Sequence, residues 1–148
     1  MAALETLHIA CAVLWLGNFV VTGFWSVRAW TSGSAPLRAF AAREIVATDL
    51  AFTLVFGAAV TISGFALAAR EGIAPLATLW TRTALEILAA CGVLWIAVLL
   101  PLELRMRALA TRGEDARFGR AFAWWNAVGW TITVALFAII YLMVGKPT

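Results

Sequence analysis

Residues 43–70 read REIVATDLAFTLVFGAAVTISGFALAAR and form a long apolar segment. Between Glu44 and Arg70 it contains one charged side chain, that of Asp49. A helix of about 20 mostly apolar residues is enough to cross the hydrocarbon layer of a bilayer. This stretch therefore predicts a transmembrane helix.

Three further apolar runs of similar length lie at about 3–28, 79–103 and 118–144. Of the 148 residues, 64% are hydrophobic and only 13% are charged, and the mean hydropathy is +0.93. A soluble domain of this size normally has about a quarter of its residues charged. The composition thus excludes a soluble domain. It predicts an all-α integral membrane protein with one domain, residues 1–148, made of four transmembrane helices.

The connections between these runs are short and rich in residues that favour loops, at 31–36, 71–75 and 111–115. Short connections force neighbouring helices to run antiparallel, which predicts an up-down four-helix bundle. Pro101 lies near one end of the third run and predicts a kink or local unwinding. The first run lacks a basic flank and is longer than a signal-peptide core, so we expect it to be a retained helix.

The basic residues are distributed unequally between the two ends of the predicted bundle. Eight of the eleven lie in or beside the segments 29–42 and 104–117, and three lie at the opposite end. The positive-inside rule places those two segments in the cytoplasm and both termini outside, on the periplasmic side of a bacterial inner membrane. Basic residues in this arrangement favour a lipid bilayer as partner and not a nucleic acid.

One face of the first helix is markedly polar. His8, Cys11, Trp15, Asn18 and Thr22 recur at alternating spacings of three and four, which places them on one stripe that should face the bundle interior. His8 is the only histidine, and a neutral imidazole can ligate haem iron or another metal. The alternative is a histidine that hydrogen-bonds to a neighbouring helix.

Arg82 and Glu86, four residues apart on the third helix, are predicted to lie at about the same depth as His8. Arg82 is a candidate partner for an anionic group such as a haem propionate. Glu86 is a candidate proton carrier, or a hydrogen-bond partner that orients His8. The alternative is that Arg82 extends to the lipid headgroups and neutralises Glu86.

A second polar group is expected toward the cytoplasmic side, where Asn18, Asp49 and Asn126 have overlapping depths. An interhelical hydrogen-bonded cluster is one interpretation, and a proton relay through the buried carboxylate is the other. Gly57 and Gly64 give the second helix a small-residue face suited to close helix packing.

The chain resembles a known family over essentially its whole length. The matching segments are LHIACAVLWLG at 7–17, TDLAFT at 48–53, LPLELR at 100–105, the tryptophan pair 124–125 and LMVGKP at 142–147. Together they resemble the predicted integral membrane family called domain of unknown function 2269. That resemblance implies a fold but no activity.

The opening histidine with a Trp-x-Gly seven residues later is also similar to HemJ-type protoporphyrinogen oxidases and CopD-type copper-resistance proteins. The HemJ resemblance implies haem binding through His8. The lysine that those proteins use in a later helix has no counterpart here, because Lys146 at the C-terminus is the only lysine. One histidine and three methionines also make a poor copper pathway.

Three functions follow as hypotheses. The first is a small redox protein of the inner membrane that binds haem b, with His8 as the iron ligand and Arg82, Glu86 and Trp15 around the cofactor. The haem would then be five-coordinate, or a homodimer or a partner in a larger membrane complex would supply the sixth ligand. The second is a non-enzymatic accessory or scaffolding subunit of such a complex, and the third is proton or solute translocation through Asp49 and Glu86.

Overall fold

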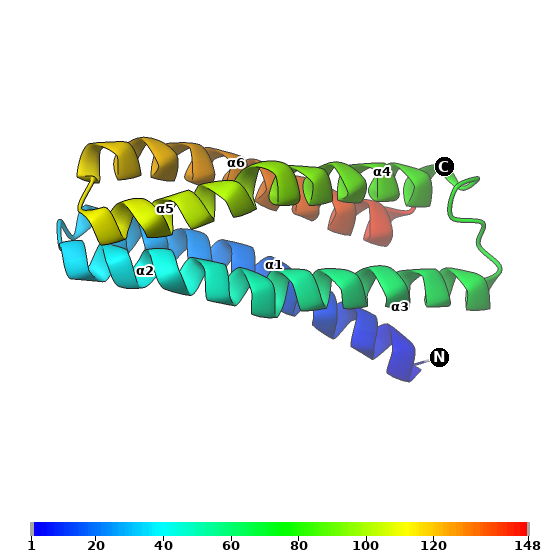
Figure 1. The fold of residues 1–148 in the computed structure, drawn as a ribbon. Helices are drawn as coiled ribbons and strands as arrows, with labels where there is room; N and C mark the ends of the chain where they lie inside the picture. The colour runs from blue at the N-terminus through cyan, green and yellow to red at the C-terminus, as the bar shows by residue number, and fades with distance from the viewer. Residues whose placement is uncertain (1, 148) are drawn as a thin grey trace.

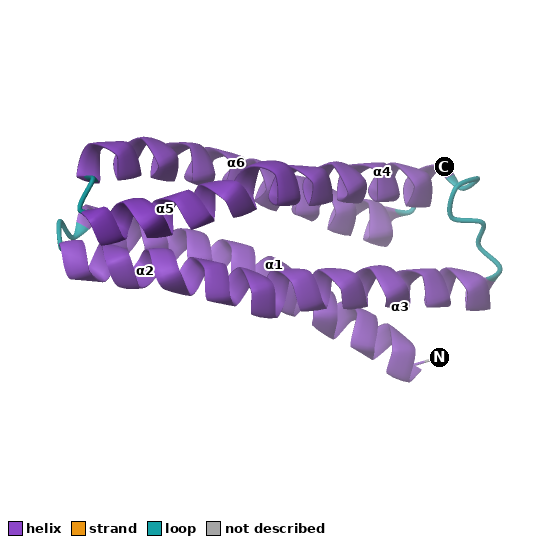
Figure 2. Cartoon of the chain, in the orientation of Figure 1, coloured by secondary structure: helices purple, strands orange, loops and turns teal. Residues whose placement is uncertain are grey.

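The computed structural model describes residues 2–147, and its regular structure is entirely helical (Figure 1, Figure 2). The first helix is α1 (Ala2–Thr31), and the last is α6 (Asp115–Gly145). The second long helix joins α2 (Ala35–Thr48), η1 (Asp49–Leu54) and α3 (Val55–Glu71). The third joins α4 (Leu79–Leu94), η2 (Trp95–Leu99) and α5 (Leu100–Arg112). All four are long and apolar enough to cross a membrane, so the predicted all-helical membrane fold is confirmed.

The helices run antiparallel in sequence order, and both termini lie at the same end of the bundle (Figure 1). We call this the terminal end, and we call the end with the α1–α2 and α5–α6 connections the basic end. The basic end is named for eight arginines: Arg28, Arg38, Arg43, Arg105, Arg107, Arg112, Arg117 and Arg120.

The helices extend further toward the basic end than the apolar runs predict. The second long helix, Ala35–Glu71, has 37 residues, or about 55 Å at 1.5 Å per residue, against a hydrocarbon layer of about 30 Å. It begins at Ala35 because Ser34 caps it, with Oγ accepting from Leu37 N at 3.4 Å, and because Pro36 fits the first turn. The polar residues that flank the apolar runs are thus helical as well. Most of the segments 29–42 and 104–117, which were expected to be loops, therefore belongs to helices.

Two of the helices end at glycines whose backbone is left-handed. Gly72 (φ 67°) terminates α3, and Gly113 (φ 68°) terminates α5. An L side chain is strained at such angles, whereas glycine is not. These two residues therefore fix where the helices stop and the connections begin.

The bundle is closed at the basic end and divided at the terminal end. Near the basic end α2 packs on α1 and α5, and α6 packs on α1 and α5. Toward the terminal end α3 packs on α1, and α4 packs on α6. Within the described residues, α3 contacts neither α4 nor α6, and α1 does not contact α4. The molecule therefore consists of four packed helices at one end and two helix pairs at the other.

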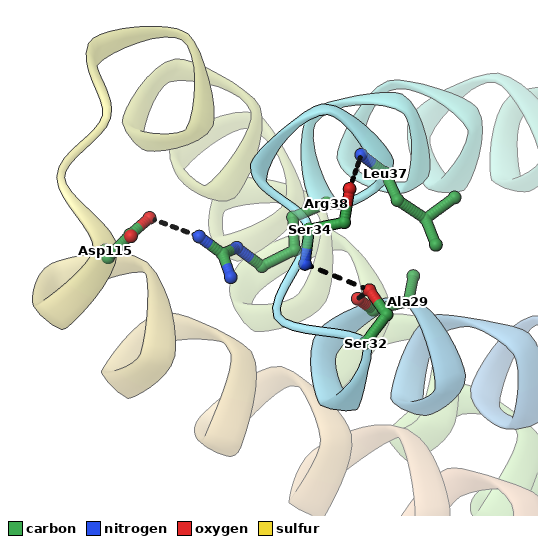
Figure 3. A network of polar contacts seen from close by, with 6 residues as sticks. All are labelled: Ala29, Ser32, Ser34, Leu37, Arg38 and Asp115. Atoms are coloured by element: carbon green, nitrogen blue, oxygen red, sulfur yellow. Dashed lines mark hydrogen bonds and ion pairs between the residues drawn. The ribbon is translucent and has the colours of Figure 1, made fainter.

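Aromatic stacking and one ion pair hold the basic end together. Trp30 stacks on Phe118 and Phe122 with ring centroids 5.5 and 5.6 Å apart. The Arg38 guanidinium lies over the Trp30 ring, 5.5 Å from its centroid, and donates to Asp115 Oδ1 at 2.8 Å (Figure 3). These contacts tie the starts of α2 and α6 to the end of α1.

Neighbouring polar contacts order the two connections at this end. Ser32 Oγ donates to the Ala29 carbonyl at 2.8 Å and accepts from Ser34 N at 3.2 Å. Figure 3 shows these residues at the α1–α2 connection. In the other connection, Arg117 donates to Glu114 at 2.8 Å, and this bond lowers the pKa of the exposed Glu114 carboxyl. Both connections are therefore fixed by local side-chain contacts.

Two π-helical segments interrupt the long helices. The segment η2 ends two residues before Pro101, which has no N–H to donate to the preceding turn, so the predicted local unwinding is confirmed. The segment η1 has no proline, and the sequence gives no comparable signal for it. Segments of this kind occur frequently at functional sites, and each of these two contributes a side chain to the site described next.

The two cysteines, Cys11 and Cys91, are free and buried. They therefore serve as small packing residues in the interior.

Candidate functional site

Asp49, the first residue of η1, is the centre of a buried polar network. The residue is only 4% exposed. Oδ1 accepts from Asn18 Nδ2 at 3.0 Å and from Thr53 Oγ1 at 3.1 Å, and Oδ2 accepts from Trp95 Nε1 at 2.9 Å. Both carboxyl oxygens are thus bonded, and every donor is neutral.

The donors are themselves held in place. Asn18 Nδ2 also lies 3.1 Å from Thr53 Oγ1, and Asn18 Oδ1 accepts from Thr22 Oγ1 at 3.2 Å. Trp95 comes from η2, so the network joins α1 to both π segments. A buried network in which each group has a partner fixes the positions of its members.

Glu103 on α5 brings a second carboxyl group to the same place. The residue is completely buried, at 0% exposure. Its Oε1 accepts from Trp125 Nε1 at 3.0 Å, whereas its buried Oε2 has no hydrogen-bond partner. Its carboxyl group is a close neighbour of that of Asp49.

No cation neutralises this pair among the described residues, since neither Asp49 nor Glu103 forms an ion pair. On the packed helices the basic residues near this level point outward and are exposed. They are Arg28 on α1, Arg43 on α2, Arg105 and Arg107 on α5, and Arg120 on α6. Arg43 is paired instead with its neighbour Glu44 at 3.0 Å.

A small cavity of about 20 Å³ adjoins the Asp49 network. Its wall includes polar side chains of Asp49, Thr22, Asn126 and Thr133. Asn126 Nδ2 is buried and has no hydrogen-bond partner among the described residues. A volume of this size with several polar partners is sufficient for one water molecule.

The carboxyl pair lies at the basic-end edge of the apolar region. Asp49 is four residues beyond Ile45, where the apolar run of its helix begins, or about 6 Å along the helix axis. Glu103 precedes Arg105 by two residues. The pair is therefore buried in protein but close to the headgroup layer at the basic end.

His8 is in a different place, on the α1–α3 interface toward the terminal end. Its Nδ1 is 2.9 Å from Ser63 Oγ, and a Cβ on Gly64 would lie 3.2 Å from its Cε1. Trp15 packs in the same way on Gly57, where a Cβ would lie 3.3 Å from the indole ring. The stripe on α1 thus faces α3, where the small glycines admit its two large rings.

Arg82 and Glu86 do not join His8. They form the expected pair, Nε to Oε1 at 3.7 Å, but their side chains are 51% and 69% exposed. Both belong to α4, which does not contact α1. Within residues 2–147 there is also no cluster of three or more His, Cys, Asp or Glu side chains able to hold a metal ion.

Of the predicted polar cluster, the structure brings Asn18 and Asp49 into contact, while Asn126 shares the cavity with Asp49 without bonding to it. Sequence reasoning missed Glu103, Trp95, Thr53 and Trp125. Glu103 was missed because it lies at the end of an apolar run, where charged residues are common. The tryptophans were missed because a tryptophan near the end of a run is typical of an interfacial anchor. One signal was available, because Trp125 follows Phe118 and Ala121 at helical spacing and so shares their face. Trp124 lies off that face and is 68% exposed.

Comparison with known families gives one match, which covers almost the whole chain. Residues 2–147 match the family described as predicted integral membrane protein (DUF2269). The chain belongs to this family. No curated protein and no solved structure matches it significantly. Membership in DUF2269 agrees with the four apolar helices and places the protein in a membrane. The family description names no activity, so a proposal about activity depends on the buried polar site.

Proposed function

We propose that this DUF2269 protein binds and releases a proton within the membrane, at the pair formed by Asp49 and Glu103, and works as a proton-coupled membrane protein. The observation that carries the proposal is the adjacency of two buried carboxyl groups whose bonded partners are all neutral. Two like charges so close together in a medium of low dielectric constant strongly repel, and desolvation adds to the cost. The pair therefore keeps at least one proton.

The two acids have different surroundings, which gives them different roles. Asp49 accepts three hydrogen bonds from neutral donors, and both of its carboxyl oxygens are bonded. Glu103 accepts one bond and keeps Oε2 unbonded, so Oε2 is the atom that carries the proton and can share it with Asp49. A water molecule in the adjoining cavity would satisfy Asn126 Nδ2 and extend the network toward α6.

Infrared spectroscopy of the protein in nanodiscs at pH 7 tests this assignment. We expect a carbonyl stretch of a protonated carboxylic acid, and we expect Glu103→Gln to abolish it because the remaining Asp49 no longer faces a second carboxylate. Glu86→Gln removes an acid that is 69% exposed, so it should leave the band unchanged. A wild-type spectrum without the band would contradict the proposal.

Proton movement requires a second measurement in proteoliposomes that contain a pH-sensitive dye. An imposed membrane potential should drive proton uptake in the wild type, and Asp49→Asn should reduce it at least tenfold. Equal uptake by both proteins would show that the carboxyl pair is not on a proton path.

Haem b at His8 is a second proposal, and it rests on the bond between Nδ1 and Ser63. A hydrogen bond to one ring nitrogen orients an imidazole that ligates through the other, so Nε2 would be the iron ligand. A sixth ligand would come from a second copy or from a partner in a larger complex. The purified protein should show a Soret band that His8→Ala removes, and a colourless folded protein would contradict this assignment.

We further infer the orientation from the basic residues, eight of which lie at the basic end. On the positive-inside rule this end faces the cytoplasm of a bacterium, and the carboxyl pair would exchange its proton on that side. Protease accessibility of a tag at the C-terminus in spheroplasts tests the orientation.

A further inference from the structure

A groove on the outside of the bundle, between the end of α1 and the start of α2, has a volume of about 430 Å³. Such a volume is within the range of small-molecule and lipid sites. Its walls are formed by Trp25, Arg28, Ala29, Ser32, Leu37, Phe40 and Ala41. The groove thus combines the cationic side chain of Arg28 with a mainly apolar wall.

Four of the eight arginines at the basic end are paired: Arg38 with Asp115, Arg43 with Glu44, and both Arg112 and Arg117 with Glu114. Of the other four, only Arg28 lines the groove. Arg28 forms no ion pair with the described part of the chain, and no acidic residue lines the groove. The groove therefore has a positive charge that the protein leaves uncompensated.

The groove also lies at the level of the lipid headgroups. The apolar run of the second long helix begins only at Ile45, beyond Phe40 and Ala41. Trp25 lies between this level and the apolar region, where tryptophans of membrane proteins are enriched. Leu37 and Phe40 are 43% and 52% exposed on the lipid-facing side. A ligand here would contact headgroup and acyl layers together.

We propose that this groove is a binding site for an anionic phospholipid. The phosphate of the headgroup bonds to the Arg28 guanidinium, and the upper part of an acyl chain packs on Trp25, Leu37 and Phe40. The match of charge and depth favours this occupant over a second copy of the chain, because the groove combines an unpaired cation with an apolar wall open to the bilayer. The inference is independent of the proton site.

Native mass spectrometry of the protein released from nanodiscs tests the site. Phosphatidylglycerol should remain bound to the wild type in preference to phosphatidylcholine, and Arg28→Gln should lower the retained phosphatidylglycerol about fivefold, since one basic residue contributes about 1 kcal/mol to anionic-lipid binding. Arg107→Gln is the matched control, because Arg107 is also exposed at the basic end but lies outside the groove. It should change retention less than twofold.

Three results would overturn the inference. Equal losses in Arg28→Gln and Arg107→Gln would show diffuse surface attraction, and equal retention of the two lipids by the wild type would show no charge selectivity. Full competition by inorganic phosphate would show an anion site without a lipid. Phosphatidylglycerol-dependent protection of the wild type against thermal unfolding, lost in Arg28→Gln, would support it even where the lipid dissociates in the gas phase.

Discussion

Replacing Asp49 with leucine is expected to lower the free energy of unfolding by about 2–4 kcal/mol, the largest effect of any single polar substitution in the chain. The change removes the acceptor of three hydrogen bonds, from Asn18, Thr53 and Trp95. A buried donor that loses its acceptor costs about 1–3 kcal/mol, and bonds between membrane helices fall toward the lower part of that range. Unfolding by sodium dodecyl sulfate in mixed micelles measures the difference.

Two variants serve as controls for this prediction. Asp49→Asn keeps an oxygen acceptor, so it should lose less than half as much stability as Asp49→Leu. Asp115→Leu removes an aspartate whose side chain is 66% exposed and which is paired with Arg38, and exposed pairs contribute about 0–1 kcal/mol. If Asp49→Leu were as stable as the wild type, the network would not hold the helices together.

Gly57→Leu is expected to separate α1 from α3 and to lower the free energy of unfolding by about 2–3 kcal/mol. A Cβ at Gly57 would already lie 3.3 Å from two atoms of the Trp15 indole, and the remaining leucine atoms have no space there. Overpacking of this kind typically costs about 1–3 kcal/mol. Because Cys11 is buried on α1, maleimide labelling of Cys11 in a Cys91→Ser background should become faster.

The control is Gly92→Leu on α4, where a Cβ would meet nothing within 4 Å. That substitution should be neutral or slightly stabilising, because leucine has a higher helix propensity than glycine. Equal destabilisation by both variants would indicate a general effect of added bulk and not a specific contact with Trp15.

The main features of the fold were predictable because the four apolar runs are long and their connections are short. The contact between Asn18 and Asp49 was also accessible, since the two residues lie at similar depths on helices that neighbour each other in sequence. Their depths follow from counting residues along a helix, which needs no knowledge of side-chain packing.

Other parts of the site could not be predicted from the pattern. The depth of Glu103 gave no indication of burial, because its inward orientation depends on how α5 packs on α2 and α6. The π segment η1 has no proline to mark it, and it changes which residues share a face. Likewise, similar depths of His8 and Arg82 predicted a common site, whereas the helices that carry them, α1 and α4, do not pack on each other.

The segment η1 also bears on how the chain tolerates changes in its length. In an α-helix each residue adds about 100° of rotation, so a one-residue deletion normally turns everything beyond it away from its partners. A π turn closes over five residues in place of four, and removing one residue from within Asp49–Leu54 converts it to an ordinary turn. The glycines of α3 would then still meet α1, while Asp49 and Thr53 would change their relative spacing. A one-residue deletion at this position would therefore preserve the packing of α3 on α1 but disrupt the polar network around Asp49.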